Sequence, residues 1–147
     1  MFKKLFKTEK KVDLKNKNIL VASLLIHAAK IDDNYTSMEK EIIKRAVIDL
    51  SKITSDEAEK LIQLAEKKEQ ESNQIVEFTR EIKKNPMEFR LKIIEILWKI
   101  VYSDGTNDIY ESNLIRRVCG LLYISNKEAG NIKEKIKLKF TSKWLTS

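Results

Sequence analysis

The fold of this chain is decided by residues 97–118, which read LWKIVYSDGTNDIYESNLIRRV. Apolar residues at helical spacing fill the first part of the stretch and return in its last part. A short polar loop with Asp104 and Gly105 separates the two parts. Asp108 and Glu111 have the spacing of a capping box, in which an N-cap side chain and a carboxylate three residues later bind free backbone N–H groups. The stretch therefore predicts a buried helix, an acidic loop and a second helix.

The same unit occurs a second time, 72 positions earlier in the chain. Thr36 stands there where the later copy has Asp108, and with Glu39 it has the spacing of the capping box of this earlier loop. Because polar and apolar positions agree together, we interpret the chain as two copies of one helix, acidic loop and helix unit. The matched positions are Asp104 with Asp32, Glu111 with Glu39, Leu114 with Ile42, Ile115 with Ile43, and Leu122 with Leu50.

Length and composition favour a single helical domain. At 147 residues the chain can bury a core without disulfides or a structural metal. Three glycines and one proline are too few for the turns of an all-β protein. We predict an all-α, single-domain bundle of about seven helices, with helices 18–31 and 86–102 side by side in its centre. The other predicted helices cover 38–52, 55–71, 75–82, 110–123 and 126–140.

Local signals predict the helix ends and faces. Ser55 and Asn126 are expected to cap the third and the last helix. Gly120 lies inside a predicted helix, where glycine costs about 1 kcal/mol relative to alanine, so we expect close helix packing there. The charged face of the third helix, which includes Glu66 and Glu69, is expected to face solvent.

The positive charge lies at the two ends of the chain. Residues 1–17 and 127–147 together hold 13 of the 29 basic and 4 of the 22 acidic residues. Residues 18–126 therefore keep 16 basic against 18 acidic residues. A nucleic-acid-binding core is basic on its recognition elements, so nucleic acid is not an expected partner. We assign 1–17 as a basic N-terminal arm, 18–140 as the helical domain and 141–147 as a C-terminal tail.

The N-terminal arm has two interpretations. Phe2, Leu5 and Phe6 lie at helical spacing among lysines, which is typical of a short helix that binds a membrane surface or a partner protein. Alternatively, the segment is a frayed turn whose aromatic side chains pack onto the domain. One helical turn buries little apolar area, so we favour the turn.

Cysteine usage and the N-terminal sequence indicate a cytoplasmic protein. The single cysteine, Cys119, cannot form an internal disulfide, and it aligns with Val47 as a small buried side chain. The first 17 residues have charges where a secretory signal has its apolar segment. His27, the only histidine, lies on a polar stripe and is expected to be partly exposed. No phosphate loop, zinc-binding histidine pair or nucleophile motif occurs, so we expect a binding or scaffolding protein and not an enzyme.

The acidic loops are the candidate metal site. Calcium and magnesium require several converging oxygen ligands, which Asp104, Asp108 and Glu111 could supply in one copy and Asp32 with Glu39 in the other. The loop is not an EF-hand, because isoleucine occupies the positions of its glycine and final glutamate. A capping box uses the same residues without a metal, so both interpretations stay open and no cofactor is certain. If a cation binds, we expect it first at the later loop, because Gly105 permits a tight backbone turn.

The residues that carry a family resemblance surround this later loop. The run Leu97 to Gly105, followed by Asp108, Tyr110-Glu111 and Leu114 to Val118, resembles the signature of the TerB-like family. These are the tellurite-resistance protein B-like proteins, which also resemble the N-terminal domain of the DnaJ-like co-chaperone DjlA. Phe78-Thr79-Arg80 is similar to a feature of the same subgroup, and the resemblance covers residues 18 to 140.

The resemblance implies a compact helical bundle with duplicated acidic loops. It also implies a metal-binding, stress-associated role without established catalysis, and it carries over the same five acidic positions of the two loops. The earlier copy departs from the family pattern, because Asp33 stands where glycine is expected and Thr36 replaces an aspartate. Tellurite biology follows only from the family name.

Two function classes follow. The first is a non-catalytic, stress-associated protein that binds a divalent cation through its acidic interhelical loops. The second is a metal-free adaptor or co-chaperone-like docking module, which would reach a membrane surface through residues 1–17. Partner proteins are expected in either class, without identification, and a second copy of this chain is one candidate.

Overall fold

The computed structural model of the protein describes residues 2–31, 35–72, 74–103 and 109–145, and within them the side chains of 16–31, 35–72, 74–103 and 112–139. The described residues form seven helices and, within these ranges, no strand. The predicted all-α fold class is confirmed. The helices are α1 (Phe2–Lys30), α2 (Ser37–Ser51), α3 (Ser55–Glu71), α4 (Ile75–Ile82), α5 (Met87–Tyr102), α6 (Ile109–Leu121) and α7 (Asn126–Leu145).

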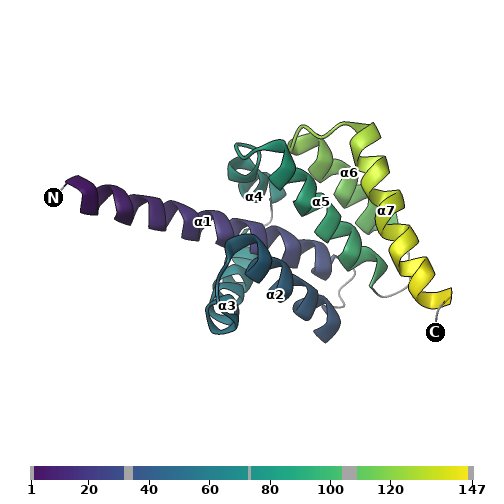
Figure 1. Cartoon of the computed structure of the whole chain (residues 1–147), viewed down its shortest axis with the longest axis horizontal. Helices are drawn as coiled ribbons and strands as arrows, with labels where there is room; N and C mark the ends of the chain where they lie inside the picture. Colours follow the sequence, from purple (N-terminus) through teal and green to yellow (C-terminus); the bar gives the residue numbers. More distant parts are fainter. Residues whose placement is uncertain (1, 32–34, 73, 104–108, 146–147) are drawn as a thin grey trace.

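Helices α1 and α5 form the centre of the bundle (Figure 1). α1 contacts α2, α3, α4 and α5, whereas α5 contacts α1, α2, α6 and α7. The short helix α4 lies between the two halves of the chain and packs on α1 and α6. The central position predicted for helices 18–31 and 86–102 is therefore confirmed.

Both central helices are apolar around most of their circumference, which requires cover on several sides. In α1 every residue from Val21 to Ala29 is buried except the half-buried His27. Burial of each large apolar side chain contributes roughly 1.5–3 kcal/mol of transfer free energy. The fully buried ones come from most of the helices: Leu24, Leu25, Ile26, Ile43, Phe78, Ile82, Ile93, Ile94, Leu97, Ile100, Ile115 and Leu122.

The helix α1 is longer than the sequence analysis predicted. It runs without a break from Phe2 to Lys30, so the preferred frayed turn at the N-terminus is wrong. The last helix likewise continues to Leu145, through most of the segment assigned as a tail. Among the described residues, no helix combines the length and the apolar character that crossing a membrane requires.

The joints after α2 and α6 share one backbone geometry. Lys52 and Tyr123 follow these helices, and both adopt the left-handed conformation, with φ of 53° and 57°. At the second joint the N–H of Ile124 donates to the carbonyl of Cys119 at 2.9 Å, which is the longer hydrogen bond of a Schellman motif. This likeness agrees with the internal repeat, which as a whole stays a prediction.

The next helix begins with the same kind of cap in both joints. The hydroxyl of Thr54 accepts a hydrogen bond from the N–H of Glu57 at 3.2 Å, and that of Ser125 accepts one from Glu128 at 3.2 Å. Each cap lies one residue before the one that the sequence analysis predicted. A hydroxyl at either position can cap, so the sequence leaves the boundary open by one residue.

Candidate functional site: carboxylates beside the first acidic loop

The structure describes only part of the five predicted metal ligands. Asp32, Asp104 and Asp108 lie outside the described residues. Glu111 belongs to α6, but its side chain is also outside the described part. Glu39 is the one whose side chain can be placed. The later loop as a cation site therefore stays a prediction.

Glu39 forms the capping box that the sequence predicted for the first loop. Its Oε1 accepts a hydrogen bond from the backbone N–H of Thr36 at 2.9 Å. In return, the hydroxyl of Thr36 accepts one from the N–H of Glu39 at 3.1 Å. The residue is only 2% exposed, which is uncommon for a glutamate and strengthens hydrogen bonds to its charge. The carboxylate thus fixes the start of α2 directly after the loop.

Two further glutamates reach this region from α3. Oε1 of Glu69 lies 3.2 Å from Nδ1 of His27, and its Oε2 lies 3.1 Å from Nζ of Lys30. Oε1 of Glu66 accepts a hydrogen bond from the hydroxyl of Tyr35 at 3.4 Å. The expectation that both glutamates face solvent is wrong, because their side chains are only 12% and 30% exposed.

Helix packing explains why these glutamates are covered. α3 lies against α1 so closely that the hydroxyl of Ser23 reaches the carbonyl of Ala65 at 3.3 Å. Glu69 is one helical turn after Ala65 and so meets the following turn of α1, which carries His27. The polar stripe of α1 is therefore matched by acidic residues of α3. His27 is partly exposed, as predicted, with 25% of its side chain accessible.

Tyr35 is the residue whose hydroxyl these carboxylates influence together. Burial raises the pKa of its hydroxyl above the usual range, and the nearby charges of Glu66, Glu39 and Glu69 raise it further. Lys40 lies 4.9 Å from the centre of the Tyr35 ring, within the range of a cation–π contact. Three carboxylates from two helices therefore act on one hydroxyl group.

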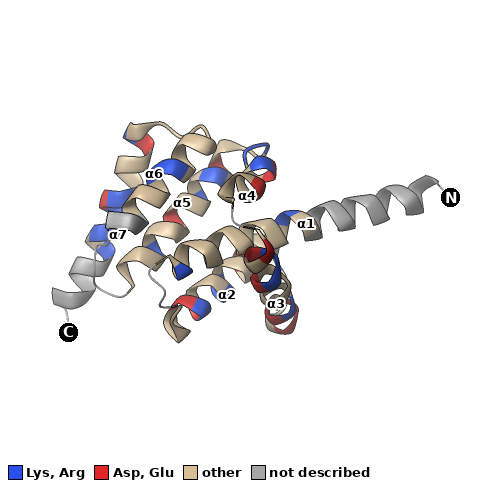
Figure 2. Ribbon diagram, turned by 180° about the vertical axis from the view of Figure 1, so that it is seen from behind, with Lys and Arg blue, Asp and Glu red and all other residues tan. Residues whose placement is uncertain are grey.

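By sequence, carboxylates outnumber lysines in this region. Glu39, Glu66 and Glu69 belong to it, and the loop that joins α1 to α2 adds Asp32 and Asp33. Lys30 and Lys40 pair with two of the glutamates, the second at 3.8 Å from Glu66. Figure 2 shows acidic and basic positions interleaved along α2 and α3. An excess of acidic residues favours a cation ligand over an anion. We name Tyr35, Glu39, Glu66 and Glu69 the Tyr35 cluster.

Within the described ranges, no three histidine, cysteine, aspartate or glutamate side chains lie close enough together to hold a metal. Oxygen ligands from the loop itself would have to complete such a site. Nor do the described residues provide an activated nucleophile. Cys119 is 4% exposed, and burial raises the pKa of its thiol to about 11, which leaves little thiolate at neutral pH.

The contact between α5 and α7, which corresponds to the contact between α1 and α3 in the first half of the chain, contains different side chains. The rings of Trp98 and Tyr102 stack with centroids 5.7 Å apart, and Nζ of Lys133 lies 5.1 Å from the Trp98 ring. Burial and the charge of Glu134 raise the pKa of Tyr102. The two halves of the chain therefore differ in the side chains that flank their acidic loops.

The sequence alone does not identify Tyr35, Glu66 and Glu69 as neighbours of the first loop. The pattern that points to the two glutamates is the acidic face of α3. Which neighbour covers this face depends on the packing of α3 against α1, and the periodicity of the sequence does not determine that packing.

Comparison with known families gives one match. The model of the family described as tellurite resistance protein TerB matches residues 18–134, which span both acidic loops. No curated protein and no solved structure matches the chain.

Proposed function

The chain belongs to the TerB family of tellurite resistance proteins, and on this premise we propose that it is a non-catalytic binding module for a divalent cation. Calcium or magnesium would bind through the acidic interhelical loops. The observation that carries the proposal is the Tyr35 cluster, in which the charges of Glu39, Glu66 and Glu69 all act on the hydroxyl of Tyr35, directly after a loop whose sequence holds two aspartates. The later loop offers Asp104, Asp108 and Glu111 by sequence.

Lys30 and Lys40, which pair with glutamates of the Tyr35 cluster, do not prevent cation binding. Exposed ion pairs contribute about 0.2–1 kcal/mol each, and the pair between Lys40 and Glu66 is long at 3.8 Å, with Lys40 half exposed. A divalent cation can replace so weak a pair where several oxygens reach it at about 2.0–2.6 Å. Glu66 is therefore the glutamate expected to turn toward a cation, whereas Glu69 keeps its contacts with His27 and Lys30.

A binding role without catalysis also agrees with the state of the reactive side chains. Cys119 has a raised thiol pKa of about 11, and His27 is engaged with Glu69 at 3.2 Å. A stress-associated role and a cytoplasmic location belong to the same proposal and are supported by the family membership and the sequence features.

Thermal melting over a calcium and magnesium series tests the proposal. A bound ion stabilises the folded state by RT ln(1 + [L]/Kd), about 2.7 kcal/mol at a concentration of 100 Kd. We expect Glu66→Gln to reduce the metal-induced rise in Tm if the first loop binds, and Asp108→Ala to reduce it if the second does. Glu59→Gln is the matched control, since Glu59 lies on the same helix, 63% exposed, and pairs with Lys44.

The capping explanation predicts a different pattern. Loss of a cap lowers stability by about 0.5–2 kcal/mol at every metal concentration. If wild type, Glu66→Gln and Asp108→Ala keep a fixed separation from chelator to millimolar metal, the acidic loops are caps and the cation proposal fails.

An adaptor at a membrane surface is the second candidate. One observation favours it: the lysine-rich segment 2–17 has a helical backbone continuous with the rest of α1, which is the conformation of segments that lie on membrane surfaces. Flotation with anionic vesicles, with and without residues 1–17, tests it. Binding that high salt weakens and truncation abolishes would support the adaptor, because salt at 0.1 M screens charges beyond about 10 Å.

A further inference from the structure

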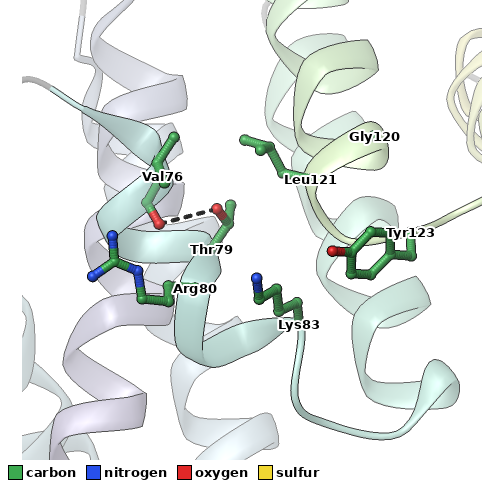
Figure 3. A pocket seen from close by; sticks show the side chains of 7 residues that line it. All are labelled: Val76, Thr79, Arg80, Lys83, Gly120, Leu121 and Tyr123. Carbon is green, nitrogen blue, oxygen red and sulfur yellow. Dashed lines mark hydrogen bonds between the residues drawn. The ribbon is translucent and has the colours of Figure 1, made fainter.

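A shallow groove lies between α4 and the end of α6 (Figure 3). In Figure 1, α4 and α6 lie on the other side of α1 from α2 and α3. Its hollow measures about 130 Å³. Pockets for small molecules and cofactors commonly measure about 300–1,000 Å³. The groove is therefore the size of a single side chain and not of a cofactor.

Gly120 keeps this groove open. A Cβ atom built on Gly120 would have no atom within 4 Å, so the predicted close helix packing at this glycine is wrong. Glycine is unfavourable in a helix, and at Gly120 no closely packed neighbour offsets this loss of stability. Leu121 and Val76 supply apolar walls on either side of the space it leaves.

Tyr123 closes one end of the groove. Its backbone φ of 57° is one that bulky side chains rarely adopt, and the residue is 70% exposed. The backbone turn that ends α6 thus presents an aromatic ring to solvent beside the hollow. Nζ of Lys83 lies 5.9 Å from the centre of this ring, and Figure 3 shows Lys83 reaching into the space between α4 and Tyr123.

Within the described residues, the cations around the groove have no acidic partner. Arg80 and Lys83 line it from α4, and in the part of the chain that the structure describes neither forms an ion pair. Arg116 and Arg117 are exposed, also without an ion pair there, and lie one helical turn before the α6 residues of the groove. Helix positions four apart share a face, so these arginines extend the basic rim.

The acidic side chains of α4 contact residues outside this rim. Glu77 accepts a hydrogen bond from Ser72 at 2.8 Å, and Glu81 pairs with Lys84 at 3.1 Å. Residues 18–126 carry more acidic than basic residues overall. A group of four unpaired cations is therefore a local feature of this surface, with basic positions on both α4 and α6 (Figure 2).

We propose that this groove binds an acidic peptide segment of a partner protein. An aliphatic side chain of the segment occupies the hollow over Gly120, and the carboxylates beside it pair with Lys83 and the arginines of the rim. Charge complementarity carries the assignment, because unpaired cations on a protein surface attract and orient an acidic partner. Because its walls are apolar, the hollow suits an aliphatic side chain of a peptide better than the polar headgroup of a lipid.

The test uses amide NMR spectra of the whole chain, titrated with a capped synthetic peptide that has one leucine between two short runs of glutamate. We expect the amide signals of Lys83, Gly120 and Leu121 to shift to saturation. Lys83→Glu should weaken binding about tenfold or more, as expected for loss of a charged contact. Lys60→Glu is the matched control, an exposed lysine on α3. Gly120→Leu, with folding checked by melting, should block the hollow.

Several results would overturn the proposal. One is the absence of shifts at the groove with millimolar peptide. Another is equal weakening by Lys83→Glu and Lys60→Glu, which would indicate general charge attraction. A peptide with glutamine in place of glutamate must bind far more weakly. Equal binding of that peptide, or shifts at the groove with inorganic phosphate or anionic vesicles as large as those with the acidic peptide, would also contradict it.

Discussion

Replacing Gly120 with alanine should stabilise the protein. The residue lies in α6, and the new Cβ would meet no atom within 4 Å. Glycine in a helix is less favourable than alanine by about 0.5–1 kcal/mol, because the unfolded chain has more freedom to lose. For a domain of this size, 1 kcal/mol corresponds to roughly 2–4 °C in Tm. We expect Gly120→Ala to raise Tm by about 1–4 °C.

Urea denaturation and thermal melting measure this change. Gly130→Ala is the matched control, because Gly130 lies within α7 and a Cβ there also has no neighbour within 4 Å. Both variants should gain similar stability, with the urea m-value unchanged. A loss of stability in Gly120→Ala alone would show that α6 packs closely against α4 at this point. That result would refute the open groove as well as the stability argument.

Three other outcomes are expected. The pKa of the Cys119 thiol is raised from 9 to about 11, so this thiol should carry about a hundredfold less thiolate than an ordinary cysteine. A disulfide reagent at pH 8 should therefore label Cys119 slowly until urea unfolds the protein. Fast labelling of the native protein would contradict the burial of Cys119. Because the pKa values of Cys119 and Tyr35 are raised by folding, their contribution to stability is complete below pH 9 and declines as the pH rises through 9 to 11 and beyond. Urea midpoints should therefore fall in this range, and less so in Tyr35→Phe; an unchanged slope in that variant would refute the role of Tyr35. Thr36→Ala should lower the free energy of unfolding by about 1–2 kcal/mol and Thr54→Ala by about 0.5–1 kcal/mol. The difference is expected because the first capping box uses the buried Glu39 and the second an exposed glutamate. Equal losses in urea denaturation would contradict it.

Much of the fold follows from the sequence, because strong apolar periodicity fixes which helices are buried. The nearly continuous apolar surface of residues 18–31 and 86–102 predicts their central position, which the packing of α1 and α5 confirms. The bounds of α3 and α4 agree with the pattern to within one residue. The capping box of Thr36 and Glu39 was also predictable, since it depends on residues only three apart.

The parts that failed depend on contacts between distant segments. Glu66 and Glu69 belong to a charged helix face, and only the packing of α3 on α1 decides that this face is covered. Gly120 could equally serve close packing or an open surface, because both use the missing side chain. The small apolar area of one helical turn suggested a frayed N-terminal arm, whereas the lysines that fill this arm are good helix formers.

The most direct test of cation binding is a calcium titration of the chelator-treated whole chain, followed by amide NMR spectra. Signals of Tyr35, Thr36 and Glu66 report on the first loop, and those of Ser103 and Ser112 flank the second. The proposed function predicts saturable shifts confined to one or both groups, and a smaller response of the first group in Glu66→Gln. Unchanged spectra through millimolar calcium and magnesium, or weak shifts spread without saturation over exposed glutamates such as Glu59, would contradict it.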